Sequence, residues 1–74
     1  MKYYFTFMQR QPMLKDHYLC IEGSWSESRQ KVFETIGDQW CFQYSEEEWK
    51  EIRSLFHTEI SLEKAKELID VCKH

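Results

Sequence analysis

One stretch of the sequence, from Trp40 to Trp49, constrains the fold more than any other. Residues 40–44 alternate aromatic rings with smaller side chains, a pattern typical of a β-strand. Ser45 follows at once, and Glu48 stands three residues after it, which is the spacing of a helix capping box. The stretch therefore predicts a strand over residues 40–44 that runs directly into a helix over residues 46–56.

Two further strands are predicted before this stretch. Residues 3–7 place three rings on one face and two further side chains, Tyr4 and Thr6, on the other, so both faces are largely apolar. A strand that is apolar on both faces is typically central in its sheet. Residues 17–22 form the second strand, and residues 9–16, with Pro12 among them, form a loop.

Three helices are predicted, each with its own cap. Ser24 and Glu27 form a second capping box, Gly37 supplies a left-handed stop, and Ser61 caps the last helix. Residues 57–60 are expected to be a plain connector. The side chains expected to face inward are Trp25, Val32, Phe33 and Ile36 in the first helix, Trp49, Ile52, Leu55 and Phe56 in the second, and Leu62, Ala65, Leu68, Ile69 and Cys72 in the third.

These elements follow the order β-β-α-β-α-α in a single small α+β domain over residues 1–74. A helical crossover makes the second and third strands parallel, with the first strand between them and antiparallel to both. We therefore expect a three-stranded mixed sheet of strand order 2-1-3, with the three helices mainly on one face.

Composition narrows the classes of function. The formal net charge is −3, which disfavours general phosphate binding. Residues 1–8 are too short an apolar run for a signal peptide or membrane span, so we expect a cytoplasmic protein without a membrane partner. The chain has three Trp, four Tyr and five Phe, more rings than so small a core holds easily, which predicts burial in a homodimer or against a partner.

The sequence predicts neither catalysis nor a bound metal or cofactor. His17 and Cys20 would point to opposite faces of a strand, and no close pair of cysteines is present. Two glycines cannot form a phosphate-binding loop. One binding surface stays open as an alternative: the rings of Tyr4, Trp40, Phe42 and Tyr44 could stack single-stranded nucleic acid.

Two groups of residues are the predicted partner contacts. In the loop over residues 9–16, Arg10, Met13 and Lys15 combine two cations with an adaptable thioether, and Arg and Met are enriched at interfaces. In the first turns of the second helix, three glutamates could engage a basic surface and speed association: Glu46, Glu47 and Glu51.

Several stretches together resemble short, largely uncharacterised proteins encoded by bacteriophages and prophages: residues 2–7, Tyr18, Ile21, residues 32–33, 36–37 and 40–49. The resemblance covers about the first two-thirds of the chain. In that group glycines follow the aromatic first strand, where this chain has Met8-Gln9-Arg10-Gln11, so its hairpin loop differs.

The resemblance implies an accessory protein that binds and inhibits a host protein in the host cytoplasm, such as a CRISPR-Cas effector or another defence component. It implies no catalytic residue. Two rival functions stay open: an oligomeric sponge that sequesters a nucleotide signal, and a single-stranded nucleic-acid-binding module.

Overall fold

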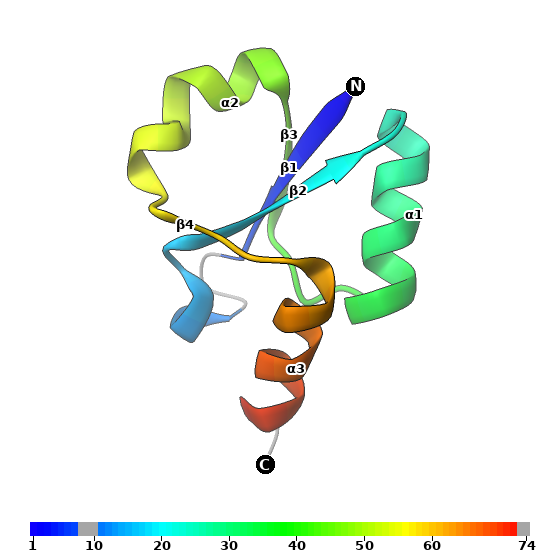
Figure 1. The fold of residues 1–74 in the computed structure, drawn as a ribbon, viewed down its shortest axis with the longest axis vertical. Coiled ribbons are helices and arrows are strands. Elements are labelled where there is room, and N and C mark those ends of the chain that lie inside the picture. The colour runs from blue at the N-terminus through cyan, green and yellow to red at the C-terminus, as the bar shows by residue number, and fades with distance from the viewer. Residues whose placement is uncertain (8–10, 73–74) are drawn as a thin grey trace.

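A four-stranded mixed sheet forms the centre of the protein. The computed structural model describes residues 1–7 and 11–72, and Figure 1 shows their arrangement. The strands are β1 (Lys2–Thr6), β2 (His17–Glu22), β3 (Phe42–Ser45) and β4 (Thr58–Glu59), in the spatial order β3-β1-β2-β4. Strand β1 is antiparallel to β2 and to β3, while β4 is parallel to β2. The α+β class is therefore confirmed, and β1 lies between β2 and β3 as expected. The prediction of a three-stranded sheet is wrong, because β4 adds a fourth strand beside β2.

Helices cover both faces of this sheet. They are α1 (Trp25–Ile36), α2 (Glu46–Ile52) and α3 (Leu62–Cys72), with two 3-10 turns, η2 (Pro12–Leu14) and η3 (Arg53–Leu55). Helices α1 and α3 pack together over one face, and α2 lies on the other side of the strands (Figure 1). The prediction that the helices lie mainly on one face is wrong for α2.

The main core lies between the sheet and the α1–α3 pair. Phe5, Phe7, Leu19, Val32 and Ala65 are completely buried there. The core is completed by Tyr3, Leu14, Ile36, Ile60 and Ile69. Tyr3, Phe5 and Phe7 point to one face of β1, as their alternation predicts.

Three elements differ from the expected boundaries, and one of them is β3, expected over residues 40–44, which begins only at Phe42. The connector over residues 57–60 contains β4, held where the Ile60 N–H donates to the Tyr18 carbonyl at 2.9 Å. Its two residues are exposed Thr58 and Glu59, so no apolar alternation marks the strand. The second helix ends at Ile52, since the chain then tightens into η3 and turns extended at Phe56.

The predicted caps are present. Ser24 accepts from the Glu27 N–H at 3.1 Å while Glu27 accepts from the Ser24 N–H, and Ser45 and Glu48 repeat this exchange. The Ser61 hydroxyl accepts from the Lys64 N–H at 3.1 Å. Gly37 adopts φ 63°, a left-handed conformation that favours glycine after a helix.

Candidate functional site

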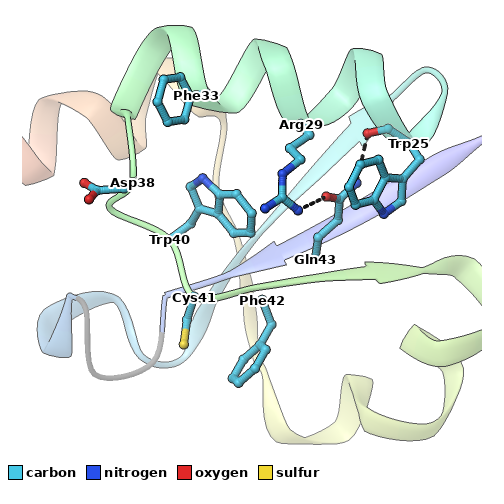
Figure 2. A pocket seen from close by; sticks show the side chains of 8 residues that line it. All are labelled: Trp25, Arg29, Phe33, Asp38, Trp40, Cys41, Phe42 and Gln43. Atoms are coloured by element: carbon cyan, nitrogen blue, oxygen red, sulfur yellow. Dashed lines mark hydrogen bonds between the residues drawn. The ribbon is translucent and has the colours of Figure 1, made fainter.

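A groove opens between helix α1 and the segment that leads into strand β3 (Figure 2). We call it the α1 groove. It encloses about 470 Å³, within the range of ligand pockets. Its lining residues are Trp25, Arg29, Phe33, Asp38, Trp40, Cys41, Phe42 and Gln43.

Arg29 lies between two tryptophans in this groove. Its guanidinium carbon is 4.8 Å from the ring centroid of Trp25 and 4.8 Å from that of Trp40. Both distances fall within the range of cation–π attraction, which holds a planar guanidinium against an indole face. Trp40 in turn packs edge-on against the buried Phe5 ring at 5.1 Å. The stack therefore connects the sheet core to the surface of α1.

Gln43 joins the two walls of the groove. Its side-chain NH₂ donates to the Trp25 carbonyl at 3.1 Å and to the Ser28 hydroxyl at 3.3 Å, while its oxygen accepts from Arg29 Nη1 at 3.3 Å. Figure 2 shows this amide reaching from β3 to α1. One amide thus fixes the strand, the helix and the guanidinium relative to one another.

Trp25, Arg29 and Phe33 follow one another at intervals of one helical turn, and we call them the α1 stripe. Trp25 is 51% exposed and Phe33 61% exposed, so the prediction that both rings face inward is wrong. Helix α1 instead buries Ser28, Val32 and Ile36, and the Ser28 hydroxyl accepts a hydrogen bond from the Gln43 amide. A second hollow of about 290 Å³ adjoins the same stripe, lined by Trp25, Ser26, Arg29, Gln30 and Phe33.

The other face of the sheet carries rings that are packed together. Trp49 stacks on Tyr4 with centroids 4.7 Å apart and an interplanar angle of 2°. Tyr18 lies 4.8 Å from Trp49, and Phe56 lies 5.3 Å from it. We call Tyr4, Tyr18, Trp49 and Phe56 the α2-side cluster.

The four rings considered as a nucleic-acid platform do not form one surface. Trp49 covers Tyr4, while Trp40 packs against Phe5 on the opposite face of the sheet. Phe42 and Tyr44 remain neighbours, with centroids 5.9 Å apart. The strand alternation predicted over residues 40–44 does not include Trp40, because β3 begins only at Phe42.

The loop residues predicted to contact a partner are only partly described. Arg10 lies outside the described residues. Met13 is 73% exposed on η2, Lys15 is exposed beside it, and neighbouring Leu14 is buried in the core. The buried leucine fixes this turn, so Met13 and Lys15 occupy defined positions on the surface.

The predicted acidic residues lie at the other end of strand β1. Glu46 accepts a hydrogen bond from the Lys2 N–H at 3.0 Å, and Glu47 and Glu51 are exposed one turn apart on α2. The five residues of β1 separate them from the loop by roughly 17 Å. The structure does not bring the two predicted groups together, and both remain predictions.

Burial shifts the pKa values of two titratable groups in and beside the α2-side cluster. Burial raises the pKa of the Cys20 thiol, and burial followed by the adjacent Cys20 raises the pKa of the Tyr4 hydroxyl. A thiol shifted in this direction stays protonated near neutral pH and is a weak nucleophile. In residues 1–7 and 11–72, no three His, Cys, Asp or Glu side chains gather as a metal site would need.

Sequence reasoning missed the α1 groove because it assigned Trp25 and Phe33 to the core. A signal was nevertheless present. Arg29 lies four residues after Trp25 and four residues before Phe33, and this spacing places the three side chains along one side of a helix. Ser28, Val32 and Ile36 offer a second, alternative stripe at the same spacing. Two competing stripes on one helix indicate that one of them faces outward.

Comparisons with protein families, with curated proteins and with solved structures found no match. No helix in the described part of the chain is long and apolar enough to cross a membrane.

Proposed function

We propose that this chain is a small protein-binding module that meets its partner through the α1 groove. The observation that carries the proposal is the α1 stripe: two rings that are at least half exposed stand on either side of a guanidinium held in place by stacking. Trp, Tyr and Arg dominate the binding energy of protein interfaces when they cluster.

The energetics favour such a contact. A ring that is half exposed leaves on the order of 100 Å² uncovered, which is worth about 2–3 kcal/mol when a partner buries it. Arg29 adds hydrogen-bonding capacity, because a guanidinium has five N–H donors and Gln43 accepts from Nη1 alone. The stripe thus offers apolar area on both sides of a positively charged centre.

The resemblance to phage-encoded proteins extends this proposal to a biological setting. The partner would be a host protein, and binding would inhibit it, as expected for an accessory protein directed against CRISPR-Cas effectors or other defence components. The loop residues Met13 and Lys15, with Arg10, and the acidic residues on α2 are the predicted secondary contacts.

The test compares three immobilised proteins in capture from host lysate. These are the wild type, the double variant Trp25→Ala/Phe33→Ala, and a control, Leu55→Ala/Val71→Ala, which removes apolar side chains that are 66% and 71% exposed elsewhere. We expect the wild type and the control to capture a host protein in stoichiometric amount. The groove variant should capture at least tenfold less of that protein. Equal capture by all three, or capture of nothing, contradicts the proposal.

Inhibition is tested separately by phage plating. Expression of the wild type should restore plaque formation on a host with an active CRISPR-Cas system, and the groove variant should not. Binding of a host protein without restored plaque formation would support the protein-binding proposal and contradict inhibition of that CRISPR-Cas system.

A nucleotide-type ligand is the second candidate, favoured by the volume of the groove and by the stacked Arg29. Aromatic faces beside a guanidinium suit a base and a phosphate. Thermal shift with adenine nucleotides and cyclic dinucleotides tests it. A stabilisation that Arg29→Ala abolishes would support this candidate over the protein-binding proposal.

A further inference from the structure

The two edges of the sheet differ in how they are protected against pairing. Edge strand β4 has two residues, Thr58 and Glu59, and is too short to template another strand. Edge strand β3 has four residues, Phe42–Ser45, and pairs only with β1 within the described part of the chain. It contains neither a charged residue nor a proline, the usual means of blocking an edge.

Strand β3 also carries a large exposed ring, that of Phe42, on the side of the strand opposite the Gln43 side chain. Phe42 is opposite Thr6 in the β1 register and is 49% exposed, while Gln43 is opposite Phe5 and points to α1. Figure 2 shows the Phe42 ring and the Gln43 amide on opposite sides of the strand. Phe42 is among the residues that line the α1 groove, but its ring points away from helix α1 and is not part of the α1 stripe.

Symmetry determines how two such edges can meet. A two-fold axis normal to the sheet makes the paired strands antiparallel and keeps each face on its own side, so only residues on the same face can be opposite. In a register centred on Gln43, Phe42 is opposite Tyr44 of the second copy, and Tyr44 is opposite the second Phe42. The symmetric pair thus forms two aromatic cross-strand contacts, a kind of pair that stabilises neighbouring strands.

Charge does not oppose this arrangement. Like charges directly opposite each other destabilise a strand pair, and a strand paired with its own copy tends to oppose like to like. The four residues of β3 are Phe, Gln, Tyr and Ser, so no such clash arises. The adjacent Glu46 is fixed away from the strand pair by its hydrogen bond with the Lys2 N–H.

We propose that two copies of this chain associate through antiparallel pairing of their β3 strands, with Phe42 opposite Tyr44 of the second copy. Two four-stranded sheets would then form one continuous sheet with an α1 groove in each copy. The contact is small, since few side chains flank a four-residue edge, which places the dissociation constant on the order of micromolar.

The first test is solution mass as a function of concentration. Sedimentation of the wild type from about 0.1 µM to about 50 µM, a range that brackets a micromolar constant, should show a rise from 9.2 kDa towards twice that mass. Phe42→Lys places a charge at the edge and should shift the association constant at least tenfold towards monomer. Thr58→Lys at the other edge is the matched control and should leave it unchanged.

The second test fixes the register. In a chain whose native cysteines are replaced by serine, Gln43→Cys should form a disulfide-linked dimer on mild oxidation, and Thr58→Cys should not. Circular dichroism of each variant shows whether its fold is retained. A monomer at every concentration, or a dimer that persists in Phe42→Lys, overturns self-pairing. Failure of self-pairing leaves the capture proposal standing, because the α1 stripe lies on helix α1 and is tested with its own variant, Trp25→Ala/Phe33→Ala.

Discussion

Two sets of aromatic side chains in this molecule differ in what they contribute. In the α2-side cluster, the Trp49 indole is stacked between Tyr4 and Phe56 and is 6% exposed. In the α1 stripe, the Trp25 indole is 51% exposed and packs against the Arg29 guanidinium. The same residue type therefore stabilises the fold at one position and offers a contact surface at the other.

The difference comes from local topology and not from the rings themselves. Helix α2 follows β3 without a loop. Trp49 lies one turn after the start of this helix and therefore packs against the sheet. Helix α1 reaches its own core contacts through Val32 and Ile36, and this leaves the neighbouring stripe at the surface. The number of aromatic residues in a small chain is consequently a poor guide to the size of its hydrophobic core, because some of the rings lie on the surface.

The largest predicted effect tests directly whether the α2-side cluster and the α1 stripe differ in role. Trp49→Ala removes the centre of the α2-side cluster and should cost about 3–5 kcal/mol in the free energy of unfolding. Trp25→Ala should cost about 1 kcal/mol, because half the ring is already in water. Urea denaturation of the two variants measures both values, and Trp49→Phe supplies a milder control. Equal losses would show that the two sets of rings do not differ in role.

A smaller effect is expected at the helix caps. Ser45→Ala and Ser24→Ala each remove a hydroxyl that accepts a backbone N–H at the start of α2 or α1, at a cost of about 1 kcal/mol. Ser45→Ala should also weaken the near-ultraviolet dichroism of the α2-side cluster, while Ser24→Ala should change Trp25 fluorescence in the α1 groove. Replacement by Asn, another favoured cap, is the control. An unchanged unfolding midpoint in either alanine variant would falsify the assignment.

The caps also predict how stability depends on pH. The Ser45 N–H lowers the pKa of Glu48, and the Ser24 hydroxyl followed by its N–H lowers that of Glu27. A lowered folded-state pKa gives stability that is present above the unfolded value, about 4.3, and is lost as pH falls through the folded value. Between neutral and acidic pH, the denaturant midpoint should therefore fall further for the wild type than for Glu27→Gln/Glu48→Gln. A parallel fall in both proteins contradicts this linkage.

The smallest effect concerns the reactivity of a thiol beneath the α2-side cluster. Burial raises the pKa of Cys20, so the thiolate is scarce near neutral pH. Alkylation by iodoacetamide should be several-fold slower at Cys20 in the folded protein than in urea, as followed by mass spectrometry of the digested chain. Trp49→Phe should narrow that difference. Rapid labelling of Cys20 in the folded protein would place this side chain at an open surface.

Local signals in the sequence predicted much of the fold. Ser24 with Glu27, and Ser45 with Glu48, mark helix starts because a hydroxyl and a carboxylate three residues apart satisfy each other's backbone N–H groups. The alternation of Tyr3, Phe5 and Phe7 gave the correct core face of β1. These signals act over a few residues, so they can be read without knowing the tertiary contacts.

Features that depend on distant contacts were not predictable in the same way. Leu55, predicted to face inward, is 66% exposed because α2 ends at Ile52 and the turn η3 redirects the chain. Strand β4 exists through hydrogen bonds to residues about 40 positions earlier in the sequence. The α1 groove likewise requires Gln43 and Trp40 to meet α1, and helical periodicity alone could not choose between the two stripes.

The Gln43 amide has a consequence for how a ligand would enter the α1 groove. Because it holds the Trp25 carbonyl, the Ser28 hydroxyl and the Arg29 guanidinium together, the cavity keeps its shape before anything arrives. A binding partner would then lose little conformational entropy on the side of this protein. Gln43→Ala should leave the walls of the groove unlinked, so that association slows and a closing step precedes tight contact.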